Sequence, residues 1–232
     1  MLYKNDNYPQ YGTDFWGNSA ENNYGFGYSE IKENIDNHPA LSANSQELHN
    51  RIFNGVDCGG MSPEFADRIA YAESRGGCQN NINDYGCINK EGVAFGRYQM
   101  QRPALIDAGY MDKNNQFIPE SGIKNMEDFL NNPQAQEQAM CNYLEKADKY
   151  NKNWNNYKYL NKNVQVGDLS IPLTKDMILA GTHREGARKL NEWLNDIEFR
   201  NNQLIKNTYH DERDKKKRHI TERFKDILYP PK

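Results

Sequence analysis

Three helix-start signals, each followed by apolar residues at helical spacing, do most to limit how this chain can fold. Ser62 is a good N-cap, and Pro63 suits the first helical position, where a missing N–H costs nothing. Asn132 and Pro133 repeat this pair, and Thr174 caps a third stretch. Helices of this kind bury one face against their neighbours, so the sequence predicts a mainly α fold.

The first of these helices carries a carboxylate on its apolar side. Phe65, Ile69 and Ala72 fall at spacings of four and three residues, and Glu73, eight residues after Phe65, lies on the same stripe. Burial removes hydration that favours the charged form, so we expect the pKa of Glu73 to rise from about 4.3 towards neutrality. A general acid working near pH 7 needs such a pKa. The competing interpretation is a glutamate at a frayed helix end, exposed or paired with a nearby arginine.

Two further segments bear on Glu73. The run from Gly96 to Met100 begins 23 residues after it and reads GRYQM, a mixture of glycine, aromatic and amide residues. Residues 178–187 read ILAGTHREGA and fall in the helix that Thr174 caps.

Together the three segments, spread over about residues 60–195, resemble the lysozyme-like superfamily. The likeness is to the soluble lytic transglycosylase and goose-type lysozyme branch and to phage-type muramidases. In those families a helix ends in Glu-Ser, here Glu73 and Ser74, and a G-x-x-Q segment, here residues 96–99, closes the cleft opposite it. The third segment departs from the family's pattern with Arg184 and Glu185, where small or amide residues are more usual. The resemblance implies a lysozyme-like helical domain with a cleft and a small irregular or β-hairpin loop region.

The resemblance also implies a reaction, cleavage of the β-1,4 bond between N-acetylmuramic acid and N-acetylglucosamine in a peptidoglycan glycan strand. Glu73 would protonate the leaving oxygen. A hydrolase (muramidase) then activates water, whereas a lytic transglycosylase uses the sugar's own 6-hydroxyl and leaves a 1,6-anhydro end. An inverting hydrolase needs a second carboxylate, for which Asp84, Glu91 and Glu185 are candidates. No cofactor or metal is expected, and the candidate substrate contacts are Ser74, Gly96, Tyr98, Gln99, Met100 and His183.

Other interpretations stay open. The fold can serve as a non-catalytic wall-binding module, or act on chitin or chitosan. It can also belong to an antibacterial toxin, with a cognate inhibitor (immunity) protein and a secretion-system carrier as partners. The net charge of -3 and a pI near 6.0 give no overall cationic attraction for nucleic acid or for anionic wall polymers.

The sequence also bears on location. No window approaches 18 apolar residues, so no membrane span is predicted. The first residues, MLYKNDNYPQYG, lack the apolar region of a secretory signal peptide. The reaction that the resemblance implies takes place outside the cytoplasm. We therefore expect the protein to be secreted or delivered to the periplasm or cell wall, through a removed signal, a specialised route or cell lysis.

Cysteine usage fits that location. Cys58, Cys78, Cys87 and Cys141 allow three pairings if all are oxidised. Because Cys78 and Cys87 bracket a short polar loop, we expect one disulfide there and a second between Cys58 and Cys141. A zinc site is the rival interpretation, but no C-x-x-C pair occurs.

The predicted parts are an Asn/Tyr/Gly-rich N-terminal segment (1–56), the catalytic domain (57–200) and a charged helical extension (201–232). The extension is expected to dock through Ile220, Phe224 and Ile227 or Leu228. Residues 150–168 are expected to form an exposed connection. Its aromatic rings are candidates for a sugar site, with surface decoration as the alternative; the residues concerned are Lys152, Trp154, Tyr157 and Tyr159.

Overall fold

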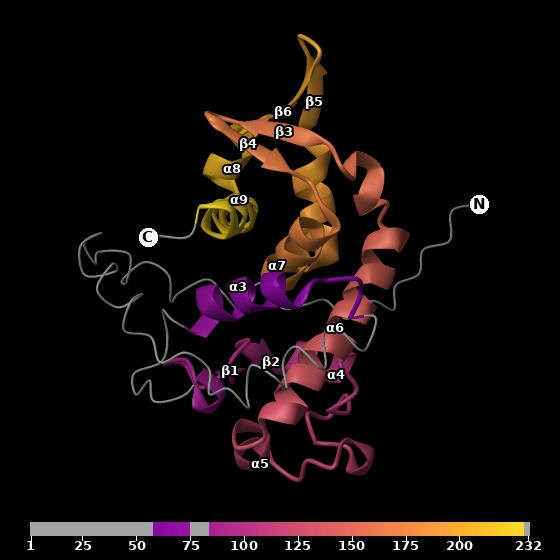
Figure 1. Cartoon of the computed structure of the whole chain (residues 1–232), viewed down its shortest axis with the longest axis vertical. Helices are drawn as coiled ribbons and strands as arrows, with labels where there is room; N and C mark the ends of the chain where they lie inside the picture. Colours follow the sequence, from indigo (N-terminus) through magenta and orange to yellow (C-terminus); the bar gives the residue numbers. More distant parts are fainter. Residues whose placement is uncertain (1–57, 75–83, 230–232) are drawn as a thin grey trace. The chain divides into compact units, whose positions relative to one another are not determined.

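The computed structural model of the chain describes residues 58–74 and 84–229 (Figure 1). Helices make up most of this part, with two small sheets, so the mainly helical fold is confirmed. None of the described helices combines the length and apolar character needed to cross a membrane. The predictions for residues 1–56 and for Cys78 lie outside the described residues. In chain order the elements are α3 (Pro63–Ser74), η1 (Asp84–Gly86), β1 (Ala94–Phe95), β2 (Met100–Gln101), α4 (Arg102–Asp107), η2 (Pro119–Ser121), α5 (Met126–Leu130), α6 (Pro133–Asn153), η3 (Asn156–Tyr159), β3 (Asn163–Val166), β4 (Leu169–Pro172), α7 (Lys175–Asn195), β5 (Ile197–Arg200), β6 (Gln203–Lys206), α8 (Tyr209–Arg213) and α9 (Lys215–Leu228).

The three predicted helix starts are confirmed. The side-chain oxygens of Ser62, Asn132 and Thr174 each accept a hydrogen bond from the backbone N–H three residues later, at 3.3, 3.0 and 3.2 Å. Each bond satisfies one of the donors that a helix leaves free at its first turn. The predicted inner face of α6 is confirmed as well, because its members are all buried; they are Gln136, Met140, Tyr143, Leu144 and Ala147.

The core forms where α7 packs against α6 and α9 (Figure 1). Trp193 of α7 is fully buried, and its ring meets the ring of Phe224 of α9 edge to face at 5.2 Å. Phe224 also packs against Gly181, where an added Cβ would lie 2.9 Å from its ring. Ile220 and Ile227 are buried beside it, so the predicted docking of the C-terminal helix is confirmed. The three-part division of the chain stays a prediction.

A four-stranded sheet, in the order β4-β3-β6-β5, covers residues that the sequence does not predict as strands. The expectation of an exposed connection over residues 150–168 is wrong at both ends, because α6 continues to Asn153 and β3 begins at Asn163. Val164 and Val166 are buried in alternation with polar residues, a pattern only four residues long. Strand β3 is held by antiparallel pairing with β4 and by parallel pairing with β6, which lies far along the chain. Local periodicity cannot reveal such a partner.

The Cys58–Cys141 disulfide is confirmed and closes a loop of 83 residues. It ties the segment before α3 to the middle of α6. Cys87 is also disulfide-bonded, while Cys78, its predicted partner, lies outside the described residues.

Removing this cross-link is expected to destabilise the protein markedly. A loop of this length constrains the unfolded chain enough to give about 4 kcal/mol of stability. The double variant Cys58→Ser/Cys141→Ser should therefore lose about that much free energy of unfolding in urea denaturation. A matched Ser62→Ala variant, which removes only one cap, should lose about 1 kcal/mol. Equal losses in the two variants would contradict the expectation.

Candidate functional site

Glu73 lies in the last turn of α3 with its side chain only 5% exposed. Arg223 donates from Nη2 to Oε1 of Glu73 at 2.5 Å. His183 Nδ1 lies 3.5 Å from the same oxygen, and Arg184 Nη1 lies 3.9 Å from Oε2. One buried carboxylate thus meets an imidazole and two guanidinium groups that come from α7 and α9.

The break in α7 follows directly after the residues that contribute to this cluster. Gly186 has φ 82° and ψ 156°, so α7 consists of two helical pieces that meet at this residue. A side chain at this position would be strained, because positive φ is costly for residues other than glycine. His183, Arg184 and Glu185 therefore occupy the last turn of the first piece.

Helix α9 contacts a second buried carboxylate one turn away from Arg223. His219 Nδ1 lies 2.7 Å from Glu185 Oε1, and these side chains are 4% and 1% exposed. Residues i and i+4 lie on one face of a helix, about 5–6 Å apart at Cβ. His219 and Arg223 therefore present two basic groups on one face of α9, and each meets a carboxylate of another helix. We call Glu73, His183, Arg184, Glu185, His219 and Arg223 the charged cluster.

The electrostatics of Glu73 differ from the sequence-based expectation. Burial acts to raise its pKa, but the Arg223 guanidinium, the His183 ring 3.5 Å away and the charge of Arg184 together hold the pKa well below its usual range. The expected rise towards neutrality is therefore wrong, and Glu73 is ionised in this arrangement. The apolar stripe predicted burial, but it could not show that arginines 111 and 150 residues further along the chain pack against Glu73.

This depressed pKa predicts that stability falls in acid. The pKa of Glu73 is lower in the folded than in the unfolded chain, so the ionised carboxylate stabilises the fold above the unfolded value of 4.5. That stabilisation is lost as the pH falls from there towards the folded pKa, by at most about 1.4 kcal/mol per pH unit. Urea denaturation between pH 3 and 7 measures the slope. A Glu73→Gln protein should show a smaller slope, and an unchanged one would contradict the linkage.

The G-x-x-Q segment forms the tight turn between β1 and β2, whose residues pair as Phe95 with Met100 and Ala94 with Gln101. Gly96 has φ 72°, and a Cβ there would lie 2.0 Å from Gln136 Oε1. That same oxygen accepts a hydrogen bond from the backbone N–H of residue 97 at 2.9 Å. Glycine is therefore required by the close approach of α6.

Inside this turn Gln99 is held by its own neighbours. It adopts φ 47°, and its Nε2 donates to Gly96 O at 2.8 Å and to Cys87 Sγ at 3.1 Å. Met100 follows as a core residue, 2% exposed. Substrate contacts by Gly96, Gln99 and Met100 stay predictions, and in this arrangement the Gln99 amide closes the turn that carries it.

Tyr98 joins a buried network that sequence reasoning missed. Its hydroxyl donates to Glu137 Oε2 at 2.7 Å, and Tyr85 donates to Oε1 at 2.6 Å. Arg97 Nη1 lies 3.5 Å from the same carboxylate, and Arg97 also bonds Asp67 of α3. Burial raises the pKa of Tyr98 well above its usual range. The network holds the β1–β2 turn against both α3 and α6.

The remaining predicted residues divide between the charged cluster and the surface. His183 and Glu185 are members of the charged cluster. Glu91 is exposed in the turn before β1 and accepts a hydrogen bond from Asn89 at 2.7 Å. Asp84 begins η1 and Ser74 ends α3, and their side chains lie outside the described part of the structure. The sequence analysis did not identify Arg223 and His219 as site residues, because their spacing predicts a shared helix face but does not show which residues contact that face.

Comparison of the chain with protein-family models, with curated proteins and with solved structures returns no match. Inference about function therefore starts from the residues and contacts described above.

Proposed function

We propose that this protein is a peptidoglycan-degrading glycosidase that cleaves the β-1,4 bond between N-acetylmuramic acid and N-acetylglucosamine, with Glu73 as the general acid. The observation that carries the proposal is the contact of Glu73 with His183 and Arg184. The Glu-Ser motif and the third motif resemble parts of one family site, and their charged residues meet although 110 positions separate them. If the two segments resembled the family by chance alone, there would be no reason for their residues to contact each other inside the protein.

Proton donation sets a condition on Arg223. A carboxylate must be protonated before it can act as a general acid, and the Arg223 guanidinium at 2.5 Å favours the ionised form. If Arg223 moves away, burial remains and acts to raise the pKa of Glu73. The proposal therefore requires that α9 release Glu73 in the active form of the enzyme.

Glu185 supports hydrolysis over transglycosylation within this proposal. Inverting hydrolases place a second carboxylate roughly 6.5–9.5 Å from the acid, with room for the attacking water between the two. The partners of Glu73 and Glu185 are Arg223 and His219, which lie one turn apart on α9. Glu185 is therefore the proposed base, because it is the candidate second carboxylate that the structure brings into the charged cluster with Glu73. Lytic transglycosylation needs only Glu73 and is the alternative outcome.

A non-catalytic wall-binding module is a second candidate, and the ionised state of Glu73 favours it. Three positively polarised groups surround this carboxylate, and a decayed enzyme could keep them as a structural ion cluster. We propose three further features only if the protein has the enzymatic function: delivery to the periplasm or cell wall, an inhibitor protein and a secretion carrier.

Digestion of purified peptidoglycan sacs by the full chain, followed by mass spectrometry of the fragments, tests the proposal. A muramidase releases fragments with reducing ends. A transglycosylase releases 1,6-anhydro ends that are lighter by one water. Protein that sediments with the sacs but releases no fragments over several pH values would instead support the binding module and contradict the glycosidase.

A further inference from the structure

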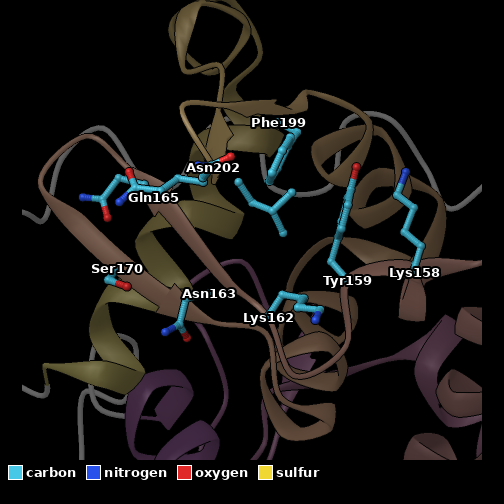
Figure 2. A pocket seen from close by; sticks show the side chains of 10 residues that line it. Lys158, Tyr159, Lys162, Asn163, Gln165, Ser170, Phe199 and Asn202 are labelled. Carbon is cyan, nitrogen blue, oxygen red and sulfur yellow. The ribbon is translucent and has the colours of Figure 1, made fainter.

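A pocket of about 590 Å³ lies between η3 and the four-stranded sheet (Figure 2), and its lining contains no residue of the charged cluster. Its walls come from η3 and from all four strands of the sheet. This volume falls within the range of pockets that hold small organic ligands, about 300–1,000 Å³.

Two aromatic rings border the pocket. Tyr159 comes from η3 and Phe199 from β5, and Figure 2 shows both side chains at its edge. Phe199 is 70% exposed, so a face of its ring is open to a ligand. Flat apolar rings stack against the apolar faces of pyranoses, and Phe199 offers such a ring, whereas Lys158 Nζ lies over the Tyr159 ring at 5.2 Å from its centre.

Amides and ammonium groups supply the polar part of the wall. Carboxamides have donors and acceptors together, which suits the hydroxyl groups of a sugar; they belong to Asn163, Gln165, Asn202 and Gln203. The only charged side chains of the lining are Lys158 and Lys162. Lys158 is positioned by a hydrogen bond to Asn195 at 2.5 Å, and Lys162 has no acidic partner among the described ion pairs. A lining with cations and no carboxylate complements an anionic ligand.

We propose that this pocket binds an acidic oligosaccharide, a pyranose chain that carries carboxylates, and so holds the glycan while another part of it is cleaved at Glu73. The choice of glycan and the link to cleavage at Glu73 rest on the proposed function, whereas binding of an acidic sugar chain does not. Two lysines in a chain of net charge -3 do not supply the extended cationic track that a nucleic-acid backbone requires, whereas they suffice for one or two carboxylates.

Titration of the full chain followed by NMR tests this site. The probe is the soluble peptide-free disaccharide of N-acetylglucosamine and N-acetylmuramic acid that ends in N-acetylmuramic acid, so it carries a free sugar carboxylate and lacks the bond proposed to be cleaved. We expect shifts of amide resonances around residues 158–165 and 199–204. Phe199→Ala should weaken binding by about tenfold through loss of stacking, and Lys162→Gln by about threefold to tenfold with a weaker salt dependence. Lys113→Gln, an exposed lysine outside the pocket lining, is the matched control and should bind like the wild type.

Three results would overturn the proposal. One is absence of shifts at the pocket, and another is equal affinity of the wild type and both pocket variants. The third is equal or tighter binding of a neutral chito-oligosaccharide or of a single-stranded oligonucleotide, which would remove the acidic glycan as the preferred ligand. Phe199 and Lys162 are exposed, so these variants should fold, and circular dichroism verifies this. Cleavage of peptidoglycan sacculi without binding at this pocket would contradict only the pocket proposal. Binding at the pocket without cleavage would contradict only the proposed glycosidase activity.

Discussion

Replacing Glu73 by glutamine is expected to lower the rate of peptidoglycan cleavage by about 10²–10⁴-fold, the usual contribution of a positioned general acid. Glutamine has nearly the same shape and can still accept the hydrogen bond that Arg223 donates. It cannot give a proton to the leaving oxygen. Initial rates of fragment release from peptidoglycan sacs measure the effect. Glu120→Gln, an exposed glutamate in η2, should match the wild type.

Loss of activity in this variant has to be separated from loss of the fold. Removing one member of a buried ion pair leaves the other charge without compensation and can cost about 3–5 kcal/mol. Thermal unfolding of Glu73→Gln therefore accompanies the kinetics, and the rates are compared well below its midpoint. Full activity in a folded Glu73→Gln protein would show that Glu73 is not the general acid. A large activity loss shared by Glu120→Gln would point to a general defect.

Much of the helical part of the fold could be predicted because its signals are local. Ser62, Asn132 and Thr174 each cap the helix that follows within a few residues, and the apolar faces of α6 and α9 have helical spacing. The sheet could not be predicted in this way. Its strands are four residues long, and β3 depends on parallel pairing with β6 across the whole of α7.

The candidate site shows the same limit in its electrostatics. The sequence predicted that Glu73 is buried, which is correct, and from burial alone it predicted a raised pKa, which is wrong. The sign depends on groups of α7 and α9, among them Arg223, which lies 150 residues away in the sequence and reaches Glu73 because α9 packs against α7 and α3. Gly96 makes a related point, since the atom that excludes a side chain there belongs to Gln136. Motif residues could be identified locally, but their charge states and steric limits are set by distant segments.

Replacing Arg223 by methionine is expected to raise the pKa of Glu73 from its depressed value, because an opposite charge in close contact favours the ionised carboxylate. Methionine keeps much of the length and apolar stem of arginine, so packing along α9 changes little. Burial of the carboxylate persists, and His183 and Arg184 still favour ionisation. Carboxyl carbon resonances followed by NMR through a pH titration measure the shift, with Glu73→Gln identifying the signal. Arg218→Met is the matched control, since Arg218 is exposed on the same helix and pairs with Glu222.

The same variant connects the pKa to the proposed chemistry. If Glu73 acts as a general acid once Arg223 withdraws, Arg223→Met should extend the active range of cleavage to higher pH, because a higher pKa keeps the carboxyl group protonated further up the scale. Arg218→Met should leave the pH profile unchanged. An unaltered pKa in Arg223→Met would mean that His183 and Arg184 alone hold Glu73 ionised. A raised pKa with no change in the pH profile would mean that Glu73 does not donate the proton, and the buried cluster would then be structural.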